Sequence, residues 1–512
     1  MRAEENLEKL HTIDREARHL ERAVAVLRWD QETYLPDKGV EERSEQLALL
    51  EGIAHERMTS AETGRLLSEL GSTSENPRGD EKLPALERDF LKVLRRNYDR
   101  AIKLPSEFVT DAARAEGLSQ AAWVSARRDN DFYAFLPHLV KMIDFSRRRA
   151  CYWGFTENPY DGLLDIYESD MDAGAISAVF TPLGERLSAL LKKISSRPKP
   201  DTRFLDQDFD TDCQARFNRD LITRLGFDSA RGRMDVSAHP FTTTLGSDDV
   251  RITTRYLPRQ IQSGIFSSIH EAGHAFYEMG FHGELRGTCL ADGASMGIHE
   301  SQSRLWENVI GRSRSFWEAM FPVLCSYFSA EFERNPGMPL VSMDDFYSAI
   351  NRVAPSLIRV EADEVSYSLH IILRFDLERE LFSGSLDPAD LPSAWRAKMK
   401  ELLGIEPDTD SQGALQDVHW SMGAFGYFPS YALGNLYGLQ FWEKLASDLP
   451  QADEMIAKGN FTAILSWLRD NIYVWGCRQD PKDLLKTVTG KSLSAEPFLG
   501  YVESKYAGIY GF

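Results

Sequence analysis

Apolar residues recur at spacings of three and four along most of this 512-residue chain. The pattern is clearest over 3–28, 40–70, 84–101 and 175–195, where residues of high helix propensity are frequent. It predicts a predominantly α protein. No segment repeats at the periods typical of solenoids, so we expect the helices to pack as one irregular multi-helix body.

Three segments interrupt the helical pattern. Two of them, 71–80 and 406–413, are polar and rich in helix breakers, and we expect surface loops there. The third, 239–256, has β-branched residues on both sides of a turn at 246–249, which predicts a β-hairpin. A short strand with a free edge in this position would let an extended peptide bind as an additional strand.

The charge of the chain limits its partners. Its formal net charge of -19 argues against a nucleic-acid or anionic-membrane partner, because both require a cationic surface. We see no secretory signal and no apolar run as long as a membrane span. The five cysteines are scattered without a Cys-x-x-Cys pair, which predicts buried or inert thiols and a cytoplasmic location.

The sequence His-Glu-Ala-Gly-His at 270–274 predicts a metal site on a helix from about 263 to 280. His270 and His274 are four residues apart and share one helix face, so both imidazoles can reach one ion. Glu271 is rotated by about 100° from His270, where it can act as a general base without binding the metal. Gly273 in mid-helix indicates that another backbone or a substrate comes close there.

A catalytic zinc ion takes three protein ligands, and we expect Glu300 to be the third. It follows a glycine-containing loop at 287–293 and begins a second helix, so it can approach the metal from another direction. Glu278 would lie about 6 Å farther along the first helix, where we expect an outer-shell role or a solvated charge. His299 is a rival ligand, since only one of the adjacent residues 299 and 300 can face the ion.

These segments resemble the M32 metallocarboxypeptidases of the carboxypeptidase Taq type. The His-Glu-x-x-His sequence at 270–274 is followed by His-Glu-Ser at 299–301, as in that family. The other segments that resemble family motifs, in the order in which they occur along the chain, are 29–33, 249–253, 358–363, 413–420 and 426–431. The resemblance spans nearly the whole chain.

The resemblance implies a broad, nearly all-helical fold with a deep active-site groove, like that of neurolysin and angiotensin-converting enzyme. It implies a single catalytic unit over 1–512, either undivided or as two lobes flanking the groove, with the helices of about 1–105 forming part of one wall. It also implies a homodimer that removes single residues from the C-termini of peptides with wide side-chain tolerance. The cofactor would be one Zn²⁺ per chain, with Co²⁺ as a possible substitute.

An exopeptidase also needs a group that binds the terminal carboxylate of its substrate. Arg359 is the first candidate, because it lies in a segment that the family resemblance singles out. The alternative for Arg359 is a plain ion pair with Glu361 or Asp363. Arg251 is a second candidate, and the alternative that we favour for it is pairing with Asp249 on the predicted strand.

Three further residues are candidates for binding the reacting part of the substrate. His419 and Tyr427 can donate hydrogen bonds to a developing oxyanion, and Tyr431 is a weaker third candidate. Core packing near Trp420 and Phe428 is the alternative for them.

Two other functions are compatible with the same residues. One is a zinc endopeptidase, oligopeptidase or dipeptidase that uses the metal site without a carboxylate clamp. The other is a non-catalytic helical scaffold with a structural metal. The presence of Glu271 argues against the scaffold, since a structural site needs ligands but no base.

Overall fold

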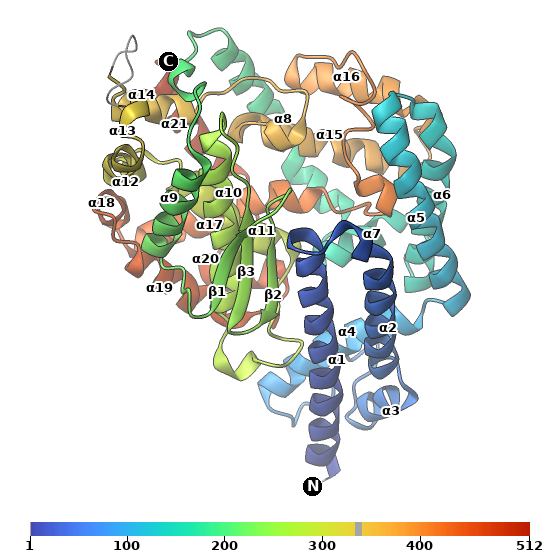
Figure 1. Ribbon diagram of the computed structural model, residues 1–512. Helices are drawn as coiled ribbons and strands as arrows, with labels where there is room; N and C mark the ends of the chain where they lie inside the picture. The colour runs from blue at the N-terminus through green and yellow to red at the C-terminus, as the bar shows by residue number, and fades with distance from the viewer. Residues whose placement is uncertain (1, 333–339) are drawn as a thin grey trace.

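A computed structural model describes residues 2–332 and 340–512 of the chain, and most of them are helical, as predicted (Figure 1). The chain begins with four helices: α1 (Arg2–Thr33), α2 (Val40–Met58), α3 (Ala61–Glu69) and α4 (Ala85–Ile102). The predicted loop at 71–80 lies between α3 and α4. Buried leucines of α1, α3 and α4 share a small core with Cys289 and Leu290. This core anchors the three helices to the loop at 287–293.

A second group of helices precedes the sheet: α5 (Ser106–Asp129), α6 (Phe132–Trp153), α7 (Pro159–Tyr167), α8 (Ala173–Ser195) and α9 (Thr211–Leu225). Their apolar faces belong to the main hydrophobic core, which continues through the C-terminal half of the chain. Within the described residues no helix is long and apolar enough to cross a membrane.

The β structure is a three-stranded sheet of β1 (Gly232–Val236), β2 (Thr242–Gly246) and β3 (Asp249–Thr254), in the order β1-β3-β2. The antiparallel β2–β3 pair is the predicted hairpin, with an irregular register between Thr244 and Gly246. Strand β1 pairs with β3 in parallel and was not predicted. Its sequence contains Gly and Asp, which are poor strand formers, and its partner lies farther along the chain.

The two faces of the sheet contact different helices. Thr242 and Thr244 of β2 donate hydrogen bonds to side chains of α10 (Ile261–Met279), so their face of the sheet lies against that helix. Arg251 is paired across strands with Thr243 and therefore belongs to the opposite face. There its guanidinium carbon lies 4.4 Å from the centre of the Trp29 ring of α1. The sheet thus separates the N-terminal helix from the helix that carries residues 270–274.

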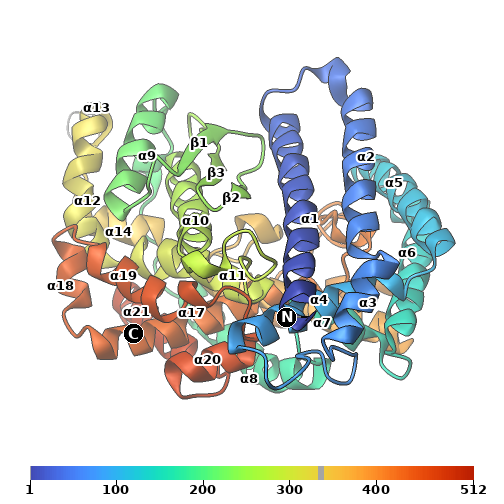
Figure 2. The same cartoon turned by 90° about the horizontal axis from the view of Figure 1, so that it is seen from below.

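The remaining helices are α11 (Met296–Arg304), α12 (Arg314–Tyr327), α13 (Ser329–Phe332), α14 (Met343–Ile350), α15 (Glu364–Ser383), α16 (Leu391–Leu403), α17 (Pro429–Asp448), α18 (Ala452–Ala457), α19 (Thr462–Asn471), α20 (Pro481–Thr489) and α21 (Glu496–Tyr510). The predicted loop at 406–413 follows α16. Figure 2 shows the hairpin of α1 and α2 on one side of α10 and α11, with α9 and α12 on the other. Helices α10, α11 and α17 are neighbours in the interior, and residues of all three build the site described next.

Candidate metal centre

The α10 helix presents the two histidines of the predicted metal site. Its buried apolar residues, among them Ile265, Ile269 and Phe276, fix the helix in the core. His270 and His274 follow one another along the same face, with ring centres 4.9 Å apart. The observed bounds agree with the predicted helix of about 263 to 280 to within two residues.

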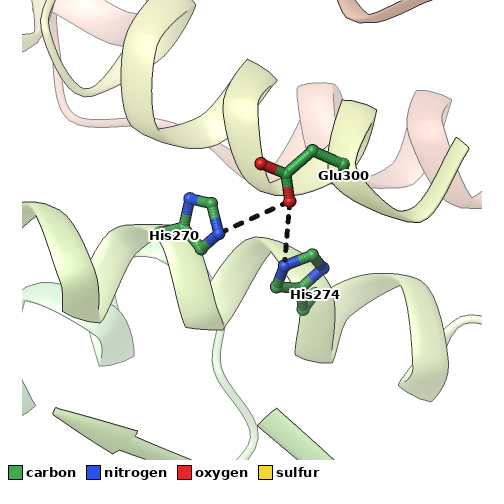
Figure 3. A group of neighbouring side chains, drawn as sticks. All are labelled: His270, His274 and Glu300. Atoms are coloured by element: carbon green, nitrogen blue, oxygen red, sulfur yellow. Dashed lines mark ion pairs between the residues drawn. The ribbon is translucent and has the colours of Figure 1, made fainter. Parts of the chain in front are cut away.

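Glu300 approaches these histidines from the separate helix α11 (Figure 3). Its Oε2 atom lies 3.7 Å from Nε2 of His270 and 3.6 Å from Nε2 of His274. Tetrahedral zinc with ligands at about 2.1 Å would separate neighbouring donor atoms by roughly 3.4 Å. Two imidazole nitrogens and one carboxylate oxygen therefore form a donor set whose chemistry and spacing fit a zinc ion.

Glycines allow the three helices to pack this closely. A Cβ atom at Gly273 would lie 2.7 Å from the Cα atom of Ser303, so α11 crosses α10 at this glycine. The expectation that another backbone approaches Gly273 is confirmed. On the other side, a Cβ atom at Gly434 of α17 would lie 2.7 Å from Cγ of Glu300. The Glu300 side chain is thus held between α10 and α17.

His270 is oriented by a carboxylate that the sequence analysis did not identify. Its Nδ1 atom lies 2.9 Å from Oε2 of Glu307, in a π-helical turn that follows α11. Arg304 and Arg312 also pair with Glu307. Against the effect of burial, the bond to His270 and these cations hold the pKa of Glu307 well below its usual range. Glu307 is thus an ionised acceptor, which favours a proton on Nδ1 of His270 and leaves Nε2 free for a metal.

His274 is oriented through a second histidine. Nδ1 of His274 lies 2.6 Å from Nδ1 of His299, and Nε2 of His299 lies 2.8 Å from Oε1 of Glu278. Both ring nitrogens of His299 thus have partners other than the metal position, and His299 is not one of the three converging donors. This geometry disfavours His299 as a rival ligand. Glu278 is buried, which excludes the solvated charge considered from the sequence.

The Glu271 side chain contacts strand β2 of the sheet. The Thr242 hydroxyl lies 2.6 Å from Oε2 of Glu271. Burial raises the pKa of Glu271, while His270 and the bond from Thr242 oppose this shift. A carboxylate in such surroundings binds protons more readily than an exposed one, as a general base at neutral pH must.

The aromatic candidates gather beside α17. Tyr431 is one helical turn before Gly434, the residue that packs on Glu300, and its ring centre lies 5.3 Å from that of Tyr427. The His419 ring lies 5.4 Å from Tyr427 and 4.6 Å from Phe428. Burial lowers the pKa of His419 to about 4, so its imidazole is neutral at pH 7. The structure brings all three candidates together. They lie beside Phe428, one of the two aromatic residues expected from core packing.

Arg359 joins the same neighbourhood, but its ion-pair partner differs from the expected one. Its Nε and Nη2 atoms bind Oδ1 of Asp417 at 3.0 and 2.9 Å, and neither Glu361 nor Asp363 pairs with it. Nη1 donates to the Tyr367 hydroxyl at 3.1 Å. Asp417 lies far along the chain in the segment 413–420, so neither spacing nor local charge could have identified this pair.

Arg251 lies elsewhere. Its guanidinium pairs with Asp249 at 2.9 Å and covers Trp29 on the sheet face opposite α10. The pairing considered for Arg251 from the sequence is therefore present. The packing of a helical tryptophan against this arginine was not foreseen.

A polar cavity of about 480 Å³ lies beside Arg304 and Glu307, which contact Glu300 and His270. Its lining includes Arg304, Glu307, Tyr367, Asn435 and Arg312. Solvent-sized space is thus available next to the residues that orient His270 and Glu300.

The family model described as carboxypeptidase Taq (M32) metallopeptidase matches residues 9–506 of this chain. The chain belongs to the M32 metallopeptidase family. The resemblance noted from the sequence is thereby confirmed. Members of this family are metallocarboxypeptidases, so the protein is a hydrolase of peptide bonds whose family implies a metal ion.

Similar M32 proteins cover the whole chain. Thermostable carboxypeptidase 1 of Thermus thermophilus is 40% identical over 100% of both chains. Carboxypeptidase 1 of Bacillus subtilis is 38% identical over 98% of this chain and 99% of its own. The crystal structure of an M32 carboxypeptidase from Deinococcus radiodurans R1 matches with a TM-score of 0.94 and 38% identity, over 99% of this chain and 100% of that one. Metallocarboxypeptidase 1 of Trypanosoma cruzi matches with a TM-score of 0.90 and 31% identity, over 98% and 99%.

Proposed function

We propose that this chain is a zinc-dependent carboxypeptidase that releases single residues from peptide C-termini and tolerates many side chains at the cleaved end. His270, His274 and Glu300 would hold the zinc ion. The convergence of these three donors, with Glu271 held beside them by Thr242, is the observation that carries the proposal. When bound, zinc supplies Lewis acidity that polarises the scissile carbonyl and acidifies a water molecule.

The protein's own residues account for proton movement and charge. Glu271 takes a proton from the attacking water and passes it to the leaving amine, a role that its position next to His270 supports. The neutral His419 imidazole and the Tyr427 hydroxyl would donate hydrogen bonds to the negatively charged carbonyl oxygen, with Tyr431 beside them. The β2 strand forms one edge of the sheet and would pair with an extended peptide.

Arg359 is the candidate for the terminal carboxylate that we favour. Its guanidinium carbon lies 5.1 Å from the centre of the Tyr431 ring, so it shares the surroundings of the oxyanion candidates. Asp417 and Tyr367 accept hydrogen bonds from all three guanidinium nitrogens, and two of the five N–H groups remain to bind a carboxylate. Arg251 is the second candidate, and its packing on Trp29 makes it less suitable.

The experiment that tests the proposal compares a free-acid peptide with its C-terminal amide, each with and without a chelator, by mass-spectrometric timing of products. Stepwise loss of single C-terminal residues from the free acid, stopped by the chelator and restored by Zn²⁺, is the expected result. Equal internal cleavage of both peptides would replace the carboxypeptidase by an endopeptidase. The metal content of the purified protein and reconstitution with Zn²⁺ or Co²⁺ identify the working metal.

The Glu271→Gln variant separates an enzyme from a scaffold. Glutamine keeps the shape of the side chain but cannot accept a proton. We expect unchanged zinc stoichiometry with turnover reduced by roughly 10²- to 10⁴-fold. Parent-like turnover in this variant would remove Glu271 from the mechanism.

The proposal also includes a single catalytic unit over 1–512 and a homodimer, which rest on the family resemblance. It includes a cytoplasmic location, which rests on the cysteine pattern noted from the sequence. Sedimentation equilibrium of the full chain measures the oligomeric state. A monomer at micromolar concentration would contradict the homodimer.

A further inference from the structure

His274 stands at one end of a chain of hydrogen bonds that crosses three elements. From His274 on α10 it passes to His299 on α11, with 2.6 Å between the two Nδ1 atoms. It continues at 2.8 Å from Nε2 of His299 to Oε1 of Glu278, one turn beyond His274 on α10. It ends on strand β2, where the Thr244 hydroxyl donates to Oε2 of Glu278 at 2.9 Å.

The direction of each bond follows from the chemistry of imidazole. In a neutral ring one nitrogen donates and the other accepts. If Nε2 of His274 binds a metal through its lone pair, then Nδ1 carries the proton and donates it to Nδ1 of His299. His299 must then carry its own proton on Nε2, where the Glu278 carboxylate accepts it. One arrangement of protons therefore satisfies every member of the chain.

The His299 ring has little freedom to leave this arrangement. A Cβ atom at Gly293 would lie 2.9 Å from Cδ2 of His299, so the loop before α11 covers one edge of the ring. The Tyr277 ring packs against it with centres 5.3 Å apart. Glu278 is only 8% exposed, so water cannot readily replace its partners.

The two histidines of the donor group are thus oriented in different ways. Glu307 contacts His270 directly, whereas Glu278 reaches His274 only through His299. We propose that His299 is a positioning residue that holds His274 in the tautomer and ring orientation needed to bind the metal, with Glu278 and Thr244 as its support. This inference rests on the proposed metal centre and adds a role for side chains outside it.

The test measures zinc affinity of the full-length chain by competition with a chromophoric chelator. In His299→Leu both His274 and Glu278 lose their partner, and we expect zinc affinity to fall by roughly 10- to 100-fold, as for other supporting residues of metal sites. In His299→Gln the amide again offers an acceptor and a donor, and we expect affinity within about 3-fold of the parent, since both bonds can form. His282→Leu, at an exposed histidine beyond the end of α10, is the matched control and should leave affinity unchanged.

A second variant and a second readout support the test if His299→Leu folds poorly. Glu278→Ala leaves the His299 ring in place but removes its acceptor, and we expect zinc affinity to fall by about 10-fold. The visible d–d spectrum of the Co²⁺-substituted protein reports the ligand geometry. It should change in His299→Leu and Glu278→Ala and stay parent-like in His299→Gln, a pattern that a loss of general stability would not produce.

Parent-like zinc affinity in both His299→Leu and Glu278→Ala would overturn the positioning role of His299. An equal loss of affinity in His299→Gln and His299→Leu would also overturn it. Failure of the metal centre itself has another signature. Equal zinc affinity of the parent and His274→Ala would place the metal elsewhere and overturn both proposals. The zinc affinities of the variants can follow the expected order while amidated and free-acid peptides are cleaved alike. This result would support the positioning role of His299 and contradict the carboxypeptidase specificity.

Discussion

The Thr242 hydroxyl lies 2.6 Å from Oε2 of Glu271 and 3.1 Å from the backbone carbonyl oxygen of the same residue. Strand β2 therefore holds the side chain that we propose as general base. Thr244, two residues farther along the same face of the strand, binds Glu278 on the same helix. One short strand thus binds two carboxylates of α10, Glu271 and Glu278.

Replacing Thr242 with valine removes the hydroxyl and keeps the shape of the side chain. A hydrogen bond to a charged group contributes about 1.5 to 3 kcal/mol. If most of it orients Glu271 in the transition state, kcat should fall about 10- to 100-fold at unchanged zinc content. Steady-state kinetics with a free-acid peptide measures this. Thr243→Val, on the opposite face of β2, is the control, and equal kinetics of the two variants would contradict the role of Thr242.

Replacing Arg359 with lysine keeps a charge but removes the planar fork that binds a carboxylate through two nitrogens. We expect the ratio of kcat/KM for a free-acid peptide to that for its amide to fall about 10-fold or more, since a charge-assisted bond is weakened only for the free acid. The same ratio should stay near the parent value in Arg251→Lys. If this ratio changed only in Arg251→Lys, Arg251 of strand β3 and not Arg359 would be the residue that binds the terminal carboxylate.

Replacing Gly273 with alanine would place a methyl group against the backbone of α11, 2.7 Å from Cα of Ser303 and 2.8 Å from the carbonyl oxygen of Gln302. Since backbone yields less easily than a side chain, we expect a loss of roughly 1 to 3 kcal/mol in the free energy of unfolding. Zinc affinity should fall as well, because Glu300 moves with α11. Gly117→Ala is the control, because a Cβ atom there meets nothing within 4 Å. Urea denaturation should find it up to about 1 kcal/mol more stable than the parent.

His370 predicts a component of acid sensitivity. It is fully buried on α15, and Nε2 lies 3.0 Å from the backbone carbonyl oxygen of Ser356. Burial and the nearby Arg374 lower the pKa of His370 to about 3, below the unfolded value of about 6.5. The depressed folded pKa means that the neutral ring stabilises the fold above pH 6.5 and that this contribution is lost as the pH falls toward 3.

The variant His370→Gln keeps a donor for Ser356 but does not titrate. Between pH 6.5 and pH 4.5 the parent should lose about 2 to 3 kcal/mol of unfolding free energy more than this variant, at 1.36 kcal/mol per pH unit. Urea denaturation of both proteins at the two pH values measures the difference. Parallel losses would show that His370 is protonated without cost in the folded protein.

Some features of the site depend only on neighbours along the chain, and the sequence predicted these. The spacing of His270 and His274 and the offset of Glu271 follow from the geometry of any α-helix. A loop followed by a new helix start was enough to single out Glu300 over Glu278. The β2–β3 hairpin was predictable for the same reason, since a short turn joins its strands.

Contacts between distant segments were decided by the tertiary structure alone. Asp417 as the partner of Arg359, Trp29 over Arg251 and the parallel strand β1 all join residues whose distance along the chain leaves no periodic signal. The bonds from Thr242 and Thr244 to α10, and the path from His274 through His299 to Glu278, exist because the sheet and α11 pack against one helix. Helix periodicity specifies which side chains share a face, but the groups that meet that face are selected by packing of the whole chain.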